Sequence, residues 1–287
     1  MQNKLILNKR NTQFLIVGLG LIGGSIAKKL SFEGFKVFAE DKDKESIRLA
    51  KKNNSIKGGL DELDIKKNII LIFAIPPKSL REEISKYESL IKSSILVTEC
   101  SSVKESIYLF FEKKNLDFNN LVLSHPIAGS ENSGFKNSNK DLFSKKICII
   151  SKTKKSSNLS VQACRELWKK LGSNTKTLDI KIHDEIFALT SHLPHLIAFG
   201  LISTLSKSNI KNIKDYVGGG MQDFTRIAES DPIMWEGILS LNKKNVLNEL
   251  TKLNLEIENL KKILNQEDQK KVIRSLSQIQ RFKKKIR

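Results

Sequence analysis

The stretch FLIVGLGLIGGSIAKKL, residues Phe14–Leu30, decides the fold of this chain. Four apolar residues run directly into the pattern Gly18-x-Gly20-x-x-Gly23, and helical spacing follows. A strand, a glycine turn and a helix in this order are typical of a dinucleotide-binding unit. We expect the first glycine to make the tight turn, the second to let the backbone approach a pyrophosphate, and the third to let the helix pack closely on its strand.

The expected cofactor contacts lie at the start of this helix and at the end of the next strand. Backbone N–H groups in the first helical turn, which includes Leu21 and Ile22, can bind the phosphates. Lys36–Ala39 is typical of a second strand, and Asp41 follows it about 20 residues past the glycines, where a carboxylate accepts the ribose hydroxyls of NAD. The sequence therefore predicts a dinucleotide site, and the alternative is a glycine-rich turn in another α/β protein.

Strand-like and helix-like segments alternate through residues 1–179. The apolar run Asn68–Ile75 is typical of a strand buried on both faces, and Pro76 after it would turn the chain across the cofactor crevice. This alternation predicts a doubly wound parallel sheet that binds ligands at the carboxyl ends of its strands. The other expected strands are Ile95–Thr98, Leu121–Leu123, Ile147–Ile150 and Thr175–Leu178, and the expected helices are Glu45–Lys52, Leu80–Tyr87, Val103–Phe111 and Leu159–Leu171.

A helical domain is expected from Ile180 onward, because no strand pattern follows. We therefore divide the chain into an α/β, Rossmann-like dinucleotide-binding domain, residues 1–179, and an all-α helical domain, residues 180–287. The stretch Phe187–Leu205 is so apolar that we expect it to lie in a core or in a subunit interface. The expected helices are Ile182–Ser206, interrupted at Pro194, and Pro232–Leu241, Val246–Leu264 and Gln269–Lys285.

Composition limits the classes of protein to which this chain can belong. The net charge is +19, but the lysines are scattered along the 287 residues, so we expect a solvated basic surface and no nucleic-acid partner. No uninterrupted apolar run is long enough to span a bilayer, and the N-terminus is too polar for a signal peptide, so no membrane partner is expected. The three cysteines have no metal-type spacing, which favours a reducing, cytoplasmic setting.

Three of the four histidines are candidates for chemistry. His125 follows an expected strand and precedes Pro126, and histidine is the usual general base for removing a hydroxyl proton; a structural or capping role is the alternative. His192 and His195 lie on one helix face, which favours an anionic or carbonyl-bearing substrate over a metal, because no acidic cluster accompanies them. For His183, at the start of the long helix, we expect exposure to solvent.

Two further segments are candidates for substrate and cofactor contacts. The run Gly218–Gly220 is not expected to hold a helix and would present backbone N–H groups to an anion. Arg226, a short way downstream, can clamp a carboxylate in bidentate fashion, and a flexible linker with a surface arginine is the alternative. Ser101 and Ser102, after another expected strand, are N-cap residues by composition and would face the nicotinamide.

Together these motifs resemble the prephenate/arogenate dehydrogenase family. They run from about Phe14 to Leu250 in the family's order and read GLGLIGGS, SSVKxxI, SHPIAGSExSG, HDxxFALTSHLPH and GGGxQDFTRIAxSDPIMW. The family oxidises and decarboxylates a cyclohexadienol, with hydride passing to a nicotinamide and CO2 leaving as the ring becomes aromatic. The resemblance implies the same reaction here, without a metal, and a homodimer formed through the helical domain.

The resemblance also implies a role for individual residues. His125 would take the proton of the ring hydroxyl, and Ser102 would orient that histidine beside the nicotinamide. His195 would contact the substrate side chain, and Arg226 would hold the ring carboxylate. The remaining pocket residues would be Ser130, Gly219 and Trp235.

The predicted function is that of an NAD-dependent prephenate dehydrogenase, which makes 4-hydroxyphenylpyruvate for tyrosine biosynthesis. Arogenate dehydrogenase, which makes tyrosine with NAD or NADP, stays open because the same pocket residues serve both substrates. Asp41 favours NAD, whereas Lys42 and Lys44 can contact the 2′-phosphate of NADP. The more remote alternatives are a β-hydroxyacid-type dehydrogenase, which would need a catalytic lysine in the helical domain, and a non-catalytic nucleotide-binding protein, which would have no use for the histidines and the arginine together.

Overall fold

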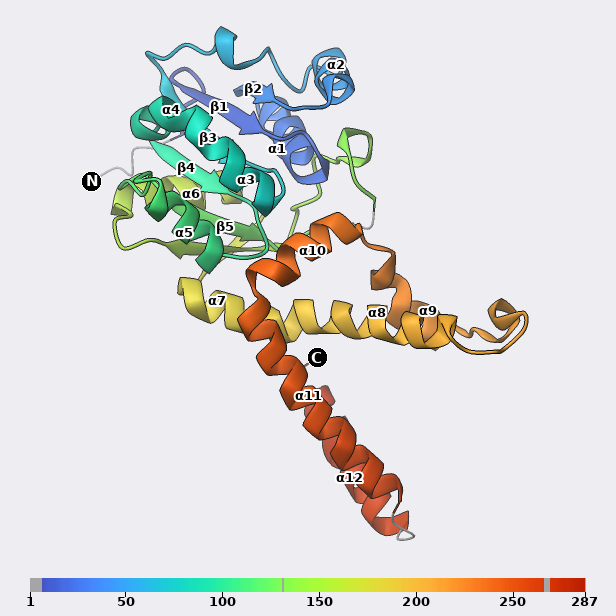
Figure 1. Ribbon diagram of the computed structural model, residues 1–287. Helices are drawn as coiled ribbons and strands as arrows, with labels where there is room; N and C mark the ends of the chain where they lie inside the picture. The colour runs from blue at the N-terminus through green and yellow to red at the C-terminus, as the bar shows by residue number, and fades with distance from the viewer. Residues whose placement is uncertain (1–6, 131, 266–268, 287) are drawn as a thin grey trace. The chain divides into compact units, whose positions relative to one another are not determined.

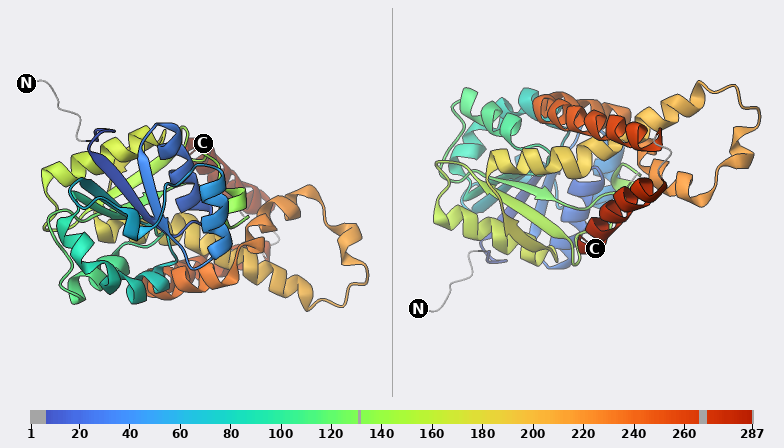
Figure 2. Two further views of the ribbon diagram at one scale, coloured as in Figure 1. Left: turned by 90° about the horizontal axis from the view of Figure 1, so that it is seen from above. Right: turned by 90° about the horizontal axis from the view of Figure 1, so that it is seen from below.

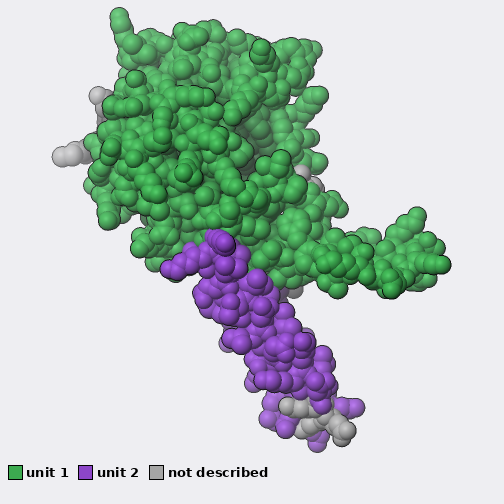
Figure 3. Space-filling view, viewed as in Figure 1, with its two compact units in different colours: residues 1–242 green, residues 243–287 purple. Residues whose placement is uncertain are grey.

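The structure is a computed structural model that describes residues 7–130, 132–265 and 269–286 (Figure 1). By its internal contacts the chain divides into two compact units, residues 1–242 and residues 243–287, which Figure 3 shows in different colours. The first unit contains the described strands and the helices α1 to α10. The second contains two helices, α11 (Lys243–Leu264) and α12 (Gln269–Lys285), which agree with the two helices expected from the sequence.

Helices lie on both faces of the sheets in the first unit (Figures 1 and 2). The described strands are β1 (Thr12–Val17), β2 (Lys36–Glu40), β3 (Asn68–Phe73), β4 (Leu96–Glu99), β5 (Val122–Pro126), β6 (Ile147–Lys152) and β7 (Asn174–Thr177). The α-helices are α1 (Leu21–Phe32), α2 (Lys44–Lys52), α3 (Pro77–Glu83), α4 (Glu88–Ser93), α5 (Glu105–Lys113), α6 (Asn158–Lys170), α7 (Ile180–Phe187), α8 (Leu193–Ser206), α9 (Gly219–Thr225) and α10 (Pro232–Leu241).

Strand β1 is buried on both faces at the centre of a parallel four-stranded sheet with the order β2-β1-β3-β4. Because side chains alternate along a strand, Phe14 and Ile16 pack with α1 and α6, whereas Leu15 and Val17 pack with the cluster that includes α3, α4 and α5. A strand buried on both faces requires apolar residues at successive positions, and Phe14–Val17 provide them. The expected α/β arrangement is therefore confirmed.

The second sheet has the order β5-β6-β7 and differs from the expected all-parallel arrangement. Strand β6 is parallel to β7 but antiparallel to β5, so the prediction of an entirely parallel sheet is wrong at this point. A parallel pair needs a crossover, usually through a helix, and the described part of the connection from β5 to β6 contains only the short 3-10 turn Phe135–Asn137. The chain therefore returns in the opposite direction.

A short parallel bridge joins the two sheets. Val97 in β4 pairs with Leu121, just before β5, and the N–H of Val97 donates to the carbonyl of Asn120. Since β1, β3 and β4 are parallel and β5 begins parallel to β4, the carboxyl ends of β1 and β5 lie at the same edge. The glycine turn after β1 and His125 near the end of β5 are therefore brought to that edge.

The long apolar stretch after β7 is interrupted before the expected position. Helix α7 ends at Phe187, a π-helical turn spans Ala188–His192, and α8 begins at Leu193. Pro194, the second residue of α8, follows this π-helical turn, and because proline has no N–H it cannot donate to a carbonyl of the preceding turn. Of the described residues, the stretch Ile180–Ser206 is also the one long and apolar enough to cross a membrane by length and composition alone.

The run Gly218–Gly220 adopts a helical start, so the prediction that it cannot hold a helix is wrong. Gly218 is the N-cap of α9, and Gly219 and Gly220 are its first two residues. Glycine costs little at these positions, because an N-cap is not helical and the first turn lacks intrahelical N–H bonds in any case. Helix α9 has seven residues and continues into the 3-10 turn Arg226–Glu229.

Candidate active site

The glycine turn after β1 has the geometry that each of its glycines was expected to provide. Gly18 has a φ of +97°, and a β-carbon there would lie 2.6 Å from the carbonyl oxygen of Ala74. A β-carbon at Gly23 would lie 1.9 Å from the carbonyl oxygen of Gly18, so the start of α1 packs directly on the turn. At Gly20 a β-carbon would meet nothing within 4 Å, which leaves open space beside the backbone.

Asp41 lies beside this turn at the end of β2. Its carboxylate accepts hydrogen bonds from the N–H groups of Leu19, at 2.5 Å, and Asp43, at 2.7 Å. Leu21 and Ile22 are the first residues of α1, a helix of 12 residues, so their N–H groups have no intrahelical acceptor. Pro76, three residues after the end of β3, is the N-cap of α3. This open turn, the helix start and the carboxylate together fit a dinucleotide.

His125 is buried at the end of β5 and is bonded to a second histidine. Its side chain is 8% exposed, and its Nδ1 lies 2.8 Å from Nε2 of His183. Nδ1 of His183 in turn lies 2.8 Å from Oδ1 of Asp184. The ring of Phe187 packs against both imidazoles. His125, His183 and Asp184 therefore form one continuous chain of hydrogen bonds.

The prediction that His183 is exposed is wrong, since the side chain is 0% exposed. Asp179 caps α7 by accepting from the N–H groups of Lys181 and Ile182, which places His183 in the first turn of the helix. Helix α7 packs against α5 and β6, so this turn faces the interior. The segment HDxxF contains these residues, but a histidine or an aspartate does not by itself indicate which face of a helix is buried.

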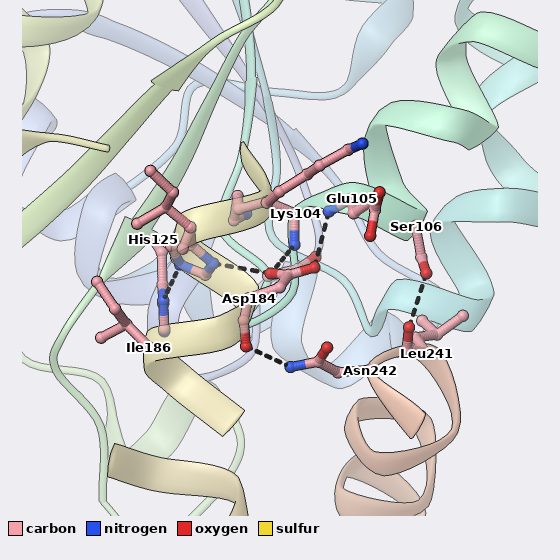
Figure 4. A network of polar contacts seen from close by, with 12 residues as sticks. Lys104, Glu105, Ser106, His125, Asp184, Ile186, Leu241 and Asn242 are labelled. Carbon is pink, nitrogen blue, oxygen red and sulfur yellow. Dashed lines mark hydrogen bonds and ion pairs between the residues drawn. The ribbon is translucent and has the colours of Figure 1, made fainter. Parts of the chain in front are cut away.

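Asp184 also caps α5, in place of the expected serines. Its carboxylate accepts from the N–H groups of Lys104, at 2.8 Å, and Glu105, at 2.9 Å (Figure 4). The N-cap of α5 is Lys104, so the expectation that Ser101 or Ser102 caps this helix is wrong. No hydrogen bond joins Ser102 to His125 in the part of the chain that the structure describes. The orienting role of Ser102 stays a prediction.

A buried ion pair between Lys104 and Glu99 lies next to the hydrogen-bonded residues His125, His183 and Asp184. The ammonium of Lys104 pairs with the carboxylate of Glu99 and donates to the carbonyl of Ser124 at 2.7 Å. Burial is the first cause that holds the pKa of His125 well below its ordinary value, and repulsion from the Lys104 ammonium, and from His183 and His192 in their protonated forms, adds to it. His125 is therefore neutral at neutral pH and able to accept a proton.

Three of the predicted substrate residues, His195, Trp235 and Arg226, lie in α8, α10 and the turn after α9. The rings of His195 and Trp235 stack with their centroids 3.8 Å apart, and Nδ1 of His195 bonds to the carbonyl of Ser191. Burial and the charge of Arg226 lower the pKa of His195, against the opposing hydrogen bond to Ser191, and the turn Arg226–Glu229 packs against α8. Gly219 and Ser130 are both exposed, and the Ser130 hydroxyl bonds to the carbonyl of Asn132 at 3.1 Å.

Asn242 connects His192 to Asp184, the last member of the hydrogen-bonded series that begins at His125. Its amide nitrogen donates to the carbonyl of Asp184 at 2.8 Å and lies 3.1 Å from Nδ1 of His192. His192 is buried, and its ring centroid lies 6.1 Å from that of Trp235. His192, which was expected to contact substrate, is thus tied to the interior, while His195 three residues later keeps a partly exposed ring.

A glycine turn that fits a dinucleotide and a neutral buried histidine lie at the edge where β1 and β5 end, which is typical of a nucleotide-dependent dehydrogenase. Residues 26–177, more than half of the chain, match the family described as "Prephenate dehydrogenase, nucleotide-binding domain". Residues 179–278 match "Prephenate dehydrogenase, dimerization domain". This chain therefore belongs to the prephenate dehydrogenase family, as the resemblance of its motifs implied.

Individual relatives agree with this assignment. The prephenate dehydrogenase of Bacillus subtilis is 28% identical over 277 residues, which cover 93% of this chain and 74% of that protein. The cyclohexadienyl dehydrogenase of Zymomonas mobilis is 26% identical, with 81% of each chain covered. A crystal structure of the Aquifex aeolicus prephenate dehydrogenase, in complex with hydroxyphenyl propionate and NAD+, is 30% identical and has a TM-score of 0.88, covering 99% of this chain and 100% of that one.

The glycine turn allows cofactor binding and folding to be separated by two substitutions. We expect Gly23→Ala to lower the free energy of unfolding by about 1–3 kcal/mol, because its β-carbon would overlap backbone at Gly18. Gly20→Ala should cost less, about 0.5–1 kcal/mol, since its β-carbon meets open space and only the preference of an N-cap for glycine over alanine is lost, but it should weaken NAD binding. Thermal unfolding and NAD titration measure the two effects, and unchanged NAD affinity in Gly20→Ala would contradict this assignment of the turn.

Proposed function

We propose that this protein is an NAD-dependent prephenate dehydrogenase of tyrosine biosynthesis. The proposed reaction converts prephenate and NAD+ into 4-hydroxyphenylpyruvate, CO2 and NADH. Membership of the family and the names of the relatives support this proposal. The observation that carries it is the position of His125, neutral and buried, at the edge of the sheet where the glycine turn also lies.

In this proposal the chain's own residues handle the proton and the carboxylates. NAD, when bound by the glycine turn, the first turn of α1 and Asp41, supplies the hydride acceptor. His125 accepts the proton of the ring hydroxyl as the hydride leaves the same carbon. The bond to the ring carboxylate then breaks, its electron pair completes the aromatic ring, and the proton returns to the ring oxygen. Atoms and charge balance without a metal or a covalent intermediate.

Substrate binding is assigned to the helical residues. Prephenate is a dianion, so it requires cationic or N–H donors at both carboxylates. Arg226 is proposed to hold the ring carboxylate and His195 to contact the side chain, and the packing of the turn Arg226–Glu229 against α8 supports a shared site. Trp235, stacked on His195, would line the pocket, with Gly219 and Ser130 as further contacts and Ser102 beside the nicotinamide.

The positions of the lysines do not favour a β-hydroxyacid-type dehydrogenase. That class would need a catalytic lysine in the helical part of the chain. The lysines between residues 180 and 242 are all exposed, and they are Lys181, Lys207, Lys211 and Lys214. The buried Lys104 lies outside this helical part, between β4 and α5, and forms an ion pair with Glu99.

We also propose the division into domains, the assembly and the setting. A boundary at residues 179 and 180 is supported by the two family matches, which end at 177 and begin at 179. A homodimer through the helical domain is supported by the description of that match and by exposed apolar side chains at Leu189, Leu201 and Ile202. A cytoplasmic setting is proposed for the biosynthetic reaction.

The proposed function is tested by NADH formation from prephenate and from arogenate, with NAD and NADP each supplied. We expect turnover of prephenate and a higher kcat/KM with NAD than with NADP. Asp41 would accept the ribose 2′-hydroxyl and repel a 2′-phosphate, and Lys42 is already paired with Glu83 at 3.2 Å. A preference for arogenate would move the protein to the alternative substrate, and a clear NADP preference would contradict the role of Asp41.

Arg226 is tested by the KM for prephenate. Loss of a charge-assisted contact to a carboxylate should raise this KM in Arg226→Ala roughly 10-fold, or about 1.4 kcal/mol, since an exposed arginine is partly screened by water. The KM for NAD should change little, and Arg226→Lys should recover only part of the loss. Arg48→Ala is the matched control, because Arg48 is an exposed arginine paired with Glu45 in α2. Equal KM values in the two alanine variants would remove Arg226 from the substrate site.

A further inference from the structure

We propose that His183 and Asp184 are positioning residues that fix the proton of His125 on Nδ1 and leave its Nε2 as the basic nitrogen. The inference rests on the proposed function, in which His125 accepts the hydroxyl proton of the substrate.

The direction of the hydrogen bonds is set at Asp184. Its two oxygens accept from the backbone N–H groups of Lys104 and Glu105, at 2.8 and 2.9 Å. These donors hold the side chain at the start of α5 as a carboxylate, which only accepts. At the 2.8 Å contact between Oδ1 and Nδ1 of His183, the proton is therefore on the nitrogen.

The protonation of His183 determines which ring donates in its hydrogen bond with His125. Burial lowers the pKa of His183, against the opposing effect of Asp184, so the ring carries a single proton at neutral pH. Because Nδ1 holds that proton, Nε2 of His183 can only accept. At the 2.8 Å contact with Nδ1 of His125, the donor is consequently His125. A neutral His125 that donates from Nδ1 has its lone pair on Nε2.

The other charged or titratable groups near His125 do not offer Nδ1 another acceptor. Lys104, next to α5, has only donors, and these are engaged by Glu99 of β4 and by the Ser124 carbonyl. His192, in the π-helical turn, uses Nδ1 toward Asn242. The thiol of Cys148, on the neighbouring β6, contacts the carbonyl of Ile149. His183, backed by Asp184, therefore controls the ring of His125.

This arrangement also serves the charged form of His125. When Nε2 takes the substrate proton, the imidazolium keeps its Nδ1–H bonded to His183, and the negative charge of Asp184 lies one ring further away. In acyl-transfer triads a carboxylate likewise orients the histidine base, and replacing that carboxylate by an amide selects the wrong tautomer of the histidine. Here the orienting carboxylate acts through an intervening imidazole.

Asp184→Asn is the sharpest test. Oδ1 accepts from both the Lys104 N–H and His183, so an amide nitrogen in its place leaves that N–H without this acceptor and donates to Nδ1 of His183. Both hydrogen bonds between the rings and residue 184 would then reverse, the proton of His125 would lie on Nε2, and kcat for prephenate should fall roughly 10²- to 10⁴-fold. The KM for NAD should stay within about a factor of two. Glu185→Gln is the matched control, because it neutralises the exposed carboxylate next in the same helix. Equal kcat in both variants would overturn the inference.

His183→Leu keeps the test valid if the loss of the α5 cap prevents Asp184→Asn from folding. Leucine removes the acceptor for Nδ1 and leaves Asp184 on α5. The imidazolium then loses its stabilising partner, so kcat should fall and the acid limb of kcat/KM should move to lower pH. A purely structural role would lower Tm and leave the acid limb where it is in the wild-type protein, which would overturn the inference.

Failure of the proposed function is distinguished by a measurement that needs no turnover. Nitrogen-15 NMR of the ring nitrogens reports which one carries the proton, and the chain has only four histidines to assign. The wild-type protein at neutral pH should show His125 protonated on Nδ1, and Asp184→Asn should show it protonated on Nε2. An unprotonated Nδ1 in wild type would overturn the inference, whereas absence of prephenate turnover with Nδ1 protonated would contradict only the proposed function.

Discussion

The carboxylate of Asp184 is the contact on which the rest of the site depends. It accepts from the first N–H groups of α5 and from His183, and its backbone carbonyl accepts from Asn242 after α10. A carboxylate at a helix N-terminus is stabilised by the donors that a helix leaves unpaired. Three segments that are distant in sequence are thereby held around one group, and His125 receives its orientation from the same contact.

The buried pair of Lys104 and Glu99 complements this arrangement. Two charges are removed from water here, which is costly unless they are paired and hydrogen-bonded, and both conditions are met at the Ser124 carbonyl and the Ser101 N–H. The pair is neutral overall, so it can sit beside His125 without a large net field. Burial therefore remains the main reason that His125 is neutral, and a neutral imidazole is what proton removal requires.

The sequence predicted what depends on local pattern and missed what depends on long-range packing. The glycine turn, β1 and α10 follow from neighbouring residues, and the structure has them where they were expected. The direction of β6 depends on the absence of a crossover helix, and the burial of His183 depends on packing between residues 58 positions apart. His125 was identified from its place at a strand end, but its partners are supplied by α7, and no spacing rule joins the two segments.

We propose that His125 removes the substrate proton, and a comparison of His125→Asn with the wild-type protein tests this role. Asparagine keeps one hydrogen bond for binding but cannot take a proton at neutral pH. We expect kcat for NADH formation from prephenate to fall about 10²- to 10⁴-fold, while the affinity for NAD stays within about a factor of two. A variant that kept near wild-type kcat with unchanged NAD affinity would contradict the claim and remove His125 as the base.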